Sequence, residues 1–298
     1  MRKVLLTGAD GFIGGYLRDT LDREEVEYLC VCQFPTDRVP KNKQVISDMT
    51  DREGLECIFQ DYRPDVIIHM AAIAFVDFKN TAELYRVNIL GTENMIEMAK
   101  KYCKPHTKFI FVSTAGVYGN QEADFYAEDL PYQPSNHYSY SKMIGEMMLK
   151  NAKDYLDIKI VRPFTVIGKG QTQGFFISKL VKAYKEKQPV IELGNINTER
   201  DYVDVSYVAE VITELVKRDN IKDEIFNICT GVASKGSDVI SMLEDMTGFH
   251  PEIQISDEFV RVNEVWRLVG SADKVKKMMA ERVECRDLKS VLQEMLEE

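Results

Sequence analysis

Short apolar runs alternate with longer segments of helical periodicity along most of the chain. The runs predict strands at 3–7, 27–33, 65–70, 107–113, 158–162 and 224–229. The spacing between them leaves room for one crossover helix each, which is typical of a parallel, doubly wound sheet. We therefore predict an α/β fold built on a large parallel sheet.

The remaining segments predict a smaller region with its own helices. These helices are expected at 174–187, 236–247, 271–280 and 287–296, with a strand near 189–193. The last helix carries one apolar stripe, which predicts a face turned to the core and consists of Leu288, Val291, Leu292 and Met295. The segment from Asp204 to Lys217 is expected to return to the large sheet together with the strand at 224–229.

Three glycines join the first strand to a helix that is predicted to begin at Phe12. Gly8, Gly11 and Gly14 have the spacing G-x-x-G-x-x-G. Such a turn brings bare backbone N–H groups and the positive end of a helix to one point, which suits the pyrophosphate of a dinucleotide. Asp10 departs from the better known G-x-G-x-x-G, so on this motif alone a glycine turn in another kind of α/β protein stays an alternative.

The end of the second strand bears on the choice of cofactor. Folds specific for NAD usually place an acidic residue about twenty residues beyond the glycines, where it holds the ribose 2′-hydroxyl. This sequence has Cys32 and Gln33 there, and Arg38 follows a few residues later. Because a missing carboxylate removes repulsion against a 2′-phosphate, we expect NADP or NAD, with NADP favoured.

Three further positions have two interpretations each. Asp48 is expected either to accept the adenine amino group or to cap a helix. The small residues after His69 either let a flat ring lie against the backbone or make a tight contact between helix and sheet. Asn88 lies in a helical segment although its helix propensity is poor, so it either borders the site or, preferably, is a structural residue with satisfied hydrogen bonds.

Hydroxyl groups follow the buried strand that begins near Phe109. Ser113 and Thr114 come at its carboxyl end, where open α/β sheets bind their ligands. About twenty residues later a helix is predicted to open with Tyr138 and Lys142, which share one face because they are four residues apart.

This pair is suited to proton transfer. A free phenol has a pKa near ~10, and a neighbouring ammonium and a cationic nicotinamide both favour its phenolate. We therefore expect Lys142 to lower the pKa of Tyr138, and Thr114 to hold the substrate oxygen while Tyr138 transfers the proton. Tyr155 and Lys159 repeat the spacing, but they lead directly into a strand and are discounted.

Composition excludes some classes of partner. The net charge of −10 disfavours a nucleic acid, and no apolar stretch is long enough to span a bilayer. No signal peptide is recognised before the first strand, and the cysteines have no metal-binding spacing, so reduced thiols in the cytoplasm are expected. Cys30 and Cys32 share one side of a strand and are expected to be small buried groups.

Six motifs in order, spread over nearly the whole chain, together resemble a known family. They are Thr7-Gly-Ala-Asp-Gly-Phe-Ile-Gly14, His69-Met-Ala-Ala72, Asn88-Ile-Leu-Gly-Thr92, Val112-Ser-Thr-Ala-Gly-Val-Tyr-Gly119, Tyr138-x-x-x-Lys142 and Arg162-Pro163. The set resembles the extended short-chain dehydrogenase/reductase family of NAD-dependent epimerases and dehydratases, whose members modify nucleotide sugars with bound NAD(P).

The resemblance implies a Rossmann fold with a smaller, interleaved α/β substrate domain. Residues 1–165 plus about 204–230 would bind the dinucleotide, and about 166–203 plus 231–298 would bind the nucleotide sugar. Thr114, Tyr138 and Lys142 are implied as the catalytic residues. The cofactor is expected to contact Gly8, Gly11, Phe12, Ile13, Gly14, Gln33, Arg38, Asp48, Met49, Ala71, Ala72, Asn88, Ser113, Tyr138, Lys142, Pro163 and Val166.

The resemblance also bears on the substrate. The run from Arg162 to Val205 is similar to the GDP-4-keto-6-deoxymannose reductases and their 4-ketoreductase relatives, which implies that Arg200 and Arg261 hold the diphosphate. Arg200 in a surface ion pair with Asp201, Arg261 as a solvated charge, and Arg267 in its place are the alternatives. Thr165 also lies in the expected substrate site, although such proteins often have Asn there.

Dehydration is disfavoured within this family. The 4,6-dehydratases carry acidic residues after the position that matches Thr114, where this chain has Ala115 and Gly116. We therefore predict an NAD(P)H-dependent reductase of a nucleotide-linked 4-keto-6-deoxyhexose, the GDP-linked sugar being favoured. The alternatives are a nucleotide-sugar 4-epimerase with retained NAD and, less favoured, a non-catalytic NAD(P) sensor. A cytoplasmic homodimer without a bound metal is expected.

Overall fold

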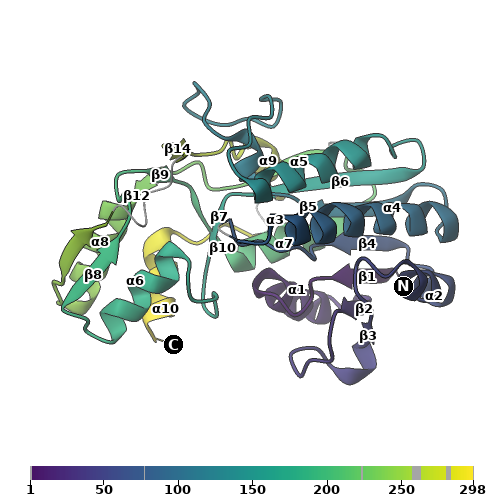
Figure 1. Ribbon diagram of the computed structural model, residues 1–298, viewed down its shortest axis with the longest axis horizontal. Coiled ribbons are helices and arrows are strands. Elements are labelled where there is room, and N and C mark those ends of the chain that lie inside the picture. The colour runs from purple at the N-terminus through teal and green to yellow at the C-terminus, as the bar shows by residue number, and fades with distance from the viewer. Residues whose placement is uncertain (1, 77, 223, 257–262, 280–282, 298) are drawn as a thin grey trace.

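The computed structural model describes every residue except 1, 77, 223, 257–262, 280–282 and 298 (Figure 1). The strands are β1 Lys3–Thr7, β2 Glu27–Cys32, β3 Gln44–Ile46, β4 Val66–His69, β5 Thr107–Val112, β6 Leu156–Pro163, β7 Thr165–Ile167, β8 Val190–Leu193, β9 Glu199–Arg200, β10 Tyr202–Asp204, β11 Ile225–Ile228, β12 Ser234–Lys235, β13 Glu252–Ile255 and β14 Arg267–Leu268. The α-helices are α1 Phe12–Arg23, α2 Arg52–Tyr62, α3 Thr81–Tyr85, α4 Gly91–Tyr102, α5 His137–Lys150, α6 Phe176–Lys185, α7 Val205–Lys217, α8 Gly236–Thr247, α9 Asp273–Met279 and α10 Leu288–Glu297. Two 3₁₀ turns, η1 Lys41–Lys43 and η3 Ala115–Tyr118, and a π-helical turn, η2 Arg86–Leu90, complete the list for the described residues.

A parallel sheet of seven strands dominates the molecule, and the predicted α/β fold is confirmed. Its order is β11-β6-β5-β4-β1-β2-β3, and every neighbouring pair is parallel. The order reverses between β1 and β4, and doubly wound sheets bind their ligands beyond the carboxyl ends of the strands at such a reversal. Each of the six predicted strands is present, with ends displaced by at most two residues.

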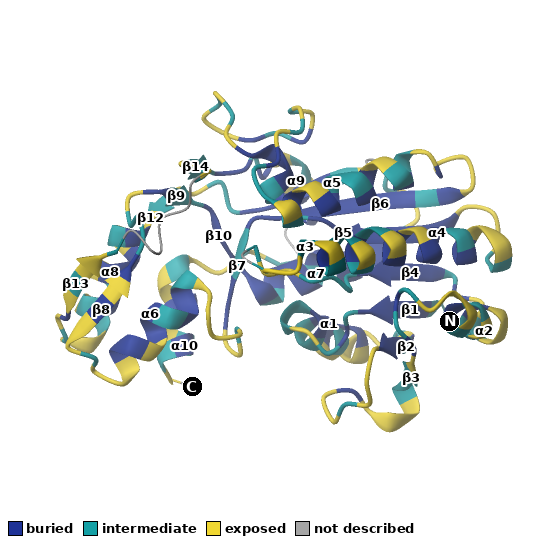
Figure 2. Ribbon diagram, viewed as in Figure 1, coloured by how far each residue is buried: buried dark blue, intermediate teal, exposed yellow. Residues whose placement is uncertain are grey.

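Helices cover both faces of this sheet. The side chain of Leu6 in β1 packs in a core with residues of α1 and α7, whereas its neighbour Leu5 packs on the opposite face with residues of α2, α4 and α5. This alternation follows from the period of two along a strand. Figure 2 shows the inner strands buried along their length, with the exposed faces of the helices turned outward.

The smaller part of the molecule lies at the left of Figure 1 and contains three short sheets, β10-β7, β12-β9-β14 and β13-β8. Helices α6, α8 and α10 pack together in its core. Val291, Leu292 and Met295 are buried there and Leu288 is partly buried, which confirms the core-facing stripe on α10. The division of the chain into a dinucleotide domain and a nucleotide-sugar domain stays a prediction.

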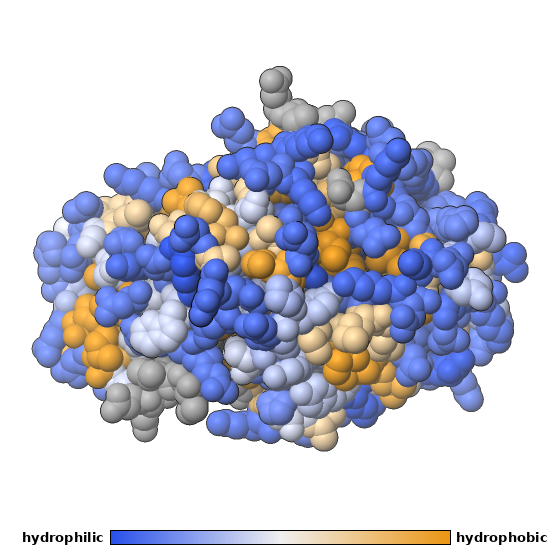
Figure 3. Space-filling view, turned by 90° about the horizontal axis from the view of Figure 1, so that it is seen from above, coloured by the Kyte–Doolittle hydropathy of each residue, from blue (hydrophilic) through white to orange (hydrophobic). Residues whose placement is uncertain are grey.

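The outer surface is mainly hydrophilic on the face shown in Figure 3, where apolar side chains gather in separate patches. Among the described residues, no helix is both long and apolar enough to cross a membrane. The described part of the chain also holds no group of three or more His, Cys, Asp or Glu side chains arranged for a metal ion.

Candidate active site

The glycine turn between β1 and α1 leaves no room for side chains. Gly8 has a φ of +71°, and a Cβ placed on it would lie 2.8 Å from the backbone nitrogen of Ala71. A Cβ on Gly14 would lie 2.3 Å from the carbonyl oxygen of Gly8. Gly11 is the N-cap of α1 and has no side chain to accept from the helix amides. The turn therefore fits the phosphates of a dinucleotide, which would be held by the free N–H groups at the start of α1.

A buried histidine fixes the neighbouring end of β4. His69 is hydrogen-bonded through Nδ1 to Thr7 Oγ1 at 2.8 Å and through Nε2 to Thr92 Oγ1 at 3.0 Å. Burial lowers the pKa of His69 to about 3, so the ring is neutral. Thr7 Oγ1 also accepts from the backbone N–H groups of Met70 and Ala71. The small residues after His69 thus lie in tight contact with the glycine turn. Both interpretations of these residues, a flat ring against the backbone and a tight contact between helix and sheet, stay predictions.

Asn88 has the structural role that was preferred. It is buried in the π-helical turn η2, and its Oδ1 accepts from the backbone N–H of Ile73 at 2.8 Å. Its Nδ2 donates to the Ile73 carbonyl and to Ser141 Oγ of α5. Asn88 therefore joins the loop after β4 to the helix that carries Tyr138.

Gln33 after β2 and Asp48 after β3 form a polar group. The interpretation of Asp48 as a helix cap is wrong. Asp51, not Asp48, caps α2, because its side chain accepts from the Gly54 N–H. Asp48 accepts from Gln33 Nε2 at 2.9 Å and from the backbone and side chain of Thr50 at 2.7 Å. Burial raises the pKa of Asp48, but the hydrogen bonds outweigh it and lower the pKa overall.

Two arginines reach the glycine turn. Arg38 donates to the Asp10 carbonyl at 3.1 Å, and Arg18 of α1 donates to the Ala9 carbonyl at 3.0 Å. Arg18 was not among the predicted site residues. Its signal in the sequence was its place four residues after Gly14, which puts both residues on the face of α1 that packs beneath the turn.

The two cysteines of β2 are confirmed as small buried groups. Cys30 and Cys32 are 0 % and 1 % exposed. Burial raises the pKa of the Cys30 thiol to about 12 and also raises that of Cys32, so both stay protonated at neutral pH.

The structure brings the predicted catalytic residues to the carboxyl end of β5. Thr114 caps the turn η3, where its Oγ1 accepts from the Gly116 N–H at 3.1 Å. Lys142 of α5 is 3 % exposed, and its Nζ donates to the carbonyl of Val112 at 2.8 Å. A Cβ on Gly116 would lie 2.4 Å from Ser139 Oγ, so η3 and α5 are packed against each other.

Burial shifts the pKa of both members of this pair. Burial raises the pKa of Tyr138 to about 12. Burial lowers the pKa of Lys142 to about 7, with Glu146 opposing the shift. In the chain without cofactor, burial therefore disfavours the charged form of both side chains. The expected lowering relied on the ammonium together with a cationic nicotinamide, and it stays a prediction for the complex with cofactor.

The end of β6 approaches the same site. Pro163 is buried, and Val166 on β7 is half-buried, with its carbonyl accepting from Gln171 Nε2 at 2.8 Å. Arg162 turns its side chain into the interior, where it forms an ion pair with Glu146 of α5. This pair was not predicted, because its two members lie on different elements and no local pattern joins them.

The predicted substrate residues have separate surroundings. Thr165 donates its backbone N–H to the Asp201 carbonyl, and the half-buried Arg200 donates to the Glu199 carbonyl at 2.9 Å. Asp201 is fully buried, so the interpretation of Arg200 and Asp201 as a surface ion pair is wrong. Arg267 is ion-paired with Glu199.

Two other sequence interpretations concern Arg261 and the pair of Tyr155 and Lys159. Arg261 lies outside the described residues. Tyr155 is exposed and precedes β6, whereas Lys159 is buried within that strand, so this pair shares no helix face and was rightly discounted.

Comparison with known proteins places the chain in a family. The model of the NAD dependent epimerase/dehydratase family matches residues 4–229. The chain belongs to this family. GDP-6-deoxy-D-talose 4-dehydrogenase of Aggregatibacter actinomycetemcomitans is 31% identical over 98% of this chain and 96% of its own length. GDP-6-deoxy-D-mannose reductase of Pseudomonas aeruginosa is 27% identical over 91% of this chain and 88% of its own length.

Solved structures of the family have the same fold. UDP-glucose 4-epimerase of Thermus thermophilus, in complex with NAD, has a TM-score of 0.86 and 26% identity over 99% of this chain and 98% of its own. The corresponding Thermotoga maritima enzyme, with UDP-glucose, has a TM-score of 0.87 and 25% identity over 99% of this chain and 97% of its own. The protein is therefore an NAD-dependent family enzyme that modifies nucleotide sugars.

Proposed function

We propose that this enzyme is a reductase of a nucleotide-linked 4-keto-6-deoxyhexose, with the GDP-linked sugar as its substrate. The observation that carries the proposal is the arrangement at the end of β5, where the turn of Thr114 meets the helix of Tyr138 and Lys142. Ala115 and Gly116 follow Thr114 and have no titratable group, so the elimination catalysed by a dehydratase lacks its acid and base. The names of two relatives, a GDP-6-deoxyhexose 4-dehydrogenase and a GDP-6-deoxyhexose reductase, support the same chemistry.

Each of these residues has a distinct role in the proposed reaction. When bound, the nicotinamide cofactor supplies a hydride. Tyr138 gives its proton to the oxygen of the sugar carbonyl, and a phenol whose pKa is raised to about 12 holds that proton at neutral pH. Thr114 steadies the same oxygen through its hydroxyl. Lys142 binds the cofactor ribose and provides a cation near Tyr138 when the phenolate forms.

NADP is the favoured cofactor within this proposal. Arg18 and Arg38 both lie against the glycine turn near the end of β2, where their charge would meet a 2′-phosphate. Gln33 stands where an acidic residue would repel that phosphate, and its amide is held by Asp48. NAD remains the alternative, and it is the cofactor named in the Thermus thermophilus structure.

The remaining parts of the proposal concern the substrate and the assembly. Arg200 and Arg261 would hold the diphosphate by paired hydrogen bonds, and Thr165 would contact the sugar. We also propose a homodimer in the cytoplasm.

A nucleotide-sugar 4-epimerase is the second candidate. The observation in its favour is the close match of fold to two UDP-glucose 4-epimerases. In such an enzyme Tyr138 would transfer its proton in both directions and NAD would be retained. A non-catalytic cofactor sensor is disfavoured, because Tyr138 and Lys142 are both present at the site.

A spectrophotometric panel tests the proposal. Oxidation of NADPH and of NADH is followed with 4-keto-6-deoxy sugars linked to GDP, dTDP, CDP and UDP. We expect the highest kcat/KM with the GDP-linked sugar and a lower KM for NADPH than for NADH. Absence of oxidation with every sugar removes the reductase, and tightly bound NAD with no net oxidation identifies the epimerase.

The variant Tyr138→Phe completes this test. It keeps the ring of Tyr138 but removes the proton donor, so we expect kcat to fall by about 10²–10⁴-fold. Cofactor affinity, measured by quenching of NADPH fluorescence, should stay within about threefold of the wild type. Turnover close to that of the wild type would contradict the assigned role of Tyr138.

A further inference from the structure

A buried carboxylate lies one helical turn beyond Lys142. Glu146 of α5 is 0 % exposed and accepts four hydrogen bonds. Its Oε1 accepts from Ser113 Oγ at 2.5 Å and from Arg162 Nε at 3.0 Å. Its Oε2 accepts from Arg162 Nη2 at 2.6 Å and from the Tyr132 hydroxyl at 2.8 Å. The carboxylate is thus fully satisfied by donors from three separate segments.

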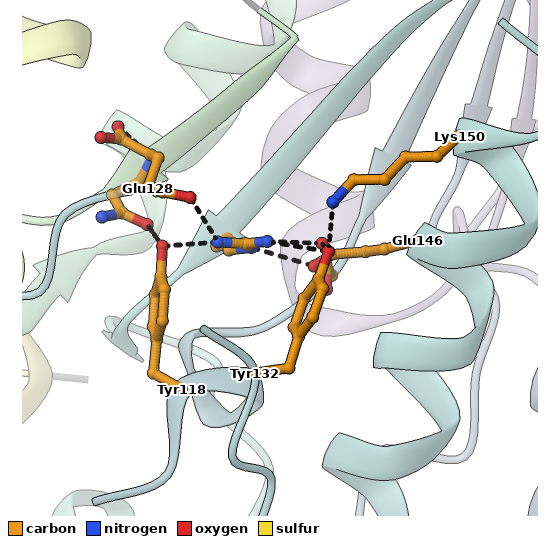
Figure 4. Close-up of polar contacts among 8 residues, drawn as sticks. Tyr118, Glu128, Tyr132, Glu146 and Lys150 are labelled. Atoms are coloured by element: carbon orange, nitrogen blue, oxygen red, sulfur yellow. Dashed lines mark hydrogen bonds and ion pairs between the residues drawn. The ribbon is translucent and has the colours of Figure 1, made fainter. Parts of the chain in front are cut away.

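The partner of this carboxylate is equally well enclosed. Arg162 is 1 % exposed, and its Nη1 donates to the Tyr118 hydroxyl at 2.7 Å and to the Glu128 carbonyl at 3.2 Å. The Tyr118 hydroxyl in turn donates to Asn227 Oδ1 at 2.7 Å. The Arg162 guanidinium carbon lies 4.8 Å from the ring centroid of Tyr118 and 5.2 Å from that of Tyr132. Figure 4 shows the two tyrosine rings, with Glu146 reaching in from α5.

Stability alone is a poor explanation for such a pair. Taking two charges out of water is costly, and apolar side chains of similar volume often fill such a place with equal or greater stability. Apolar contacts do not depend strongly on angle, whereas hydrogen bonds do. Hydrogen bonds therefore fix the relative position of the segments that they join.

The joined segments are those that carry the proposed catalytic residues. Ser113 directly precedes Thr114, and Arg162 directly precedes Pro163. The carboxylate itself is four residues from Lys142, on the same face of α5. One side chain therefore connects the ends of β5 and β6 to the catalytic helix, and a shift of about 1 Å at such a site costs about 10²-fold in rate.

We propose that Glu146 is a positioning residue, which through Ser113 and Arg162 holds Thr114 and Pro163 in register with the face of α5 that bears Tyr138 and Lys142. It touches no reacting atom. For its kinetic consequence, the proposal rests on the proposed reductase function.

The test removes the contacts without leaving a lone buried charge. In the double variant Glu146→Met/Arg162→Met both charges are replaced by apolar chains. The variant Glu146→Gln/Arg162→Met also lacks the ion pair, but its amide oxygen can still accept from Ser113. Tyr132→Phe is the control. It removes a hydroxyl that donates to Glu146 and accepts from Arg162 and Lys150, and it leaves the bonds of Glu146 to Ser113 and Arg162 in place.

The kinetic readout is the single-turnover rate of NADPH oxidation with enzyme in excess, which does not depend on the fraction of folded enzyme. We expect this rate to fall by about 10–100-fold in the Met/Met variant, to recover at least in part in the Gln/Met variant, and to stay within about threefold in the control. A folded Met/Met variant with the rate of the wild type would overturn the proposal.

A second readout is independent of turnover. Amide hydrogen exchange of the peptide 112–119 should accelerate in the Met/Met variant, while exchange in β1 and β2 stays as in the wild type. Unchanged exchange at 112–119 would overturn the proposal, even if the wild type reduces no sugar and the proposed function itself fails.

If the double variant does not fold, Glu146→Asp replaces it in both measurements, because aspartate keeps the charge but is too short to reach Ser113.

Discussion

Lys142 is the residue whose burial has the clearest consequence for pH dependence. Its pKa is about 7 in the folded chain, against an ordinary value of 10.5, and the cause is burial, with Glu146 opposing. Between these values the unfolded chain binds the proton and the folded chain does not, so stability rises with pH across this window. Below pH 7 Lys142 is protonated in both states, so the unfolding free energy is lowered by the full cost of burying its charge.

The variant Lys142→Met removes this titration. Relative to it, the wild type without cofactor should gain roughly 3 kcal/mol of unfolding free energy between pH 7 and pH 10. Urea denaturation at a series of pH values measures the difference. Lys153→Met, at an exposed position, supplies the baseline. If the curves of the wild type and Lys142→Met run parallel over this range, Lys142 is not buried as a neutral amine.

Tyr138, Lys142 and the aspartates before α2 show which properties of single residues can be predicted from the sequence. The spacing of Tyr138 and Lys142 predicts a shared helix face whatever the packing around them, and the structure has this face. Their pKa values in the chain without cofactor depend on desolvation, which arises only when α5 packs on β5, so local sequence did not reveal these shifts. Asp48 and Asp51 both follow a strand, and local sequence did not tell which of them caps α2.

At the scale of elements, α1 and β1 depend on a glycine that the chain cannot replace. A Cβ at Gly14 would meet the Gly8 carbonyl at 2.3 Å, and the nearest atoms belong to the backbone, so α1 has to move away from the turn. We expect Gly14→Ala to weaken NADPH binding at least tenfold and to lower the unfolding free energy by about 1–3 kcal/mol. Fluorescence titration and urea denaturation measure these effects.

The next residue provides a matched control. Gly15 also lies within α1, but a Cβ there would have only Arg18 Nη2 nearby, at 3.9 Å. Because alanine is the better helix former, Gly15→Ala should raise the unfolding free energy by about 0.5–1 kcal/mol and leave NADPH binding unchanged. Equal effects of the two substitutions would show that α1 does not pack tightly on the turn.

Elements with a strong internal pattern were predicted, and those without one were missed. The buried strands of the large sheet are rich in apolar residues, α1 begins at Phe12 as predicted, and α8 and α10 lie within two residues of their predicted bounds. Strands β9, β12 and β14 have two residues each and show no period that a sequence could reveal. They exist because the backbone of one segment meets that of another, which is decided by tertiary contacts.

In the molecule as a whole, one carboxylate joins segments from distant parts of the chain. Asp201 lies between β9 of a small sheet and β10, and it is fully buried. Its Oδ1 accepts from the N–H and hydroxyl of Thr230, and its Oδ2 from the N–H groups of Gly231 and Gly270. Its backbone donates to Leu268 and accepts from Thr165. The loop after β11 of the large sheet and strands β7 and β14 of the smaller part therefore meet around one residue.

The variant Asp201→Asn tests this joint. An amide keeps the volume of the side chain but turns an NH₂ group toward backbone N–H donors, leaving buried donors without an acceptor. We expect a loss of about 3 kcal/mol, seen in calorimetry as a fall in the unfolding midpoint of roughly 5 °C or more. If Asp201 couples the two parts, the single unfolding transition of the wild type should broaden or divide in Asp201→Asn, because the parts then unfold separately.

The exposed substitution Asp154→Asn should change neither the midpoint nor the width. A midpoint and width of Asp201→Asn equal to those of this control would show that the two parts are held together elsewhere.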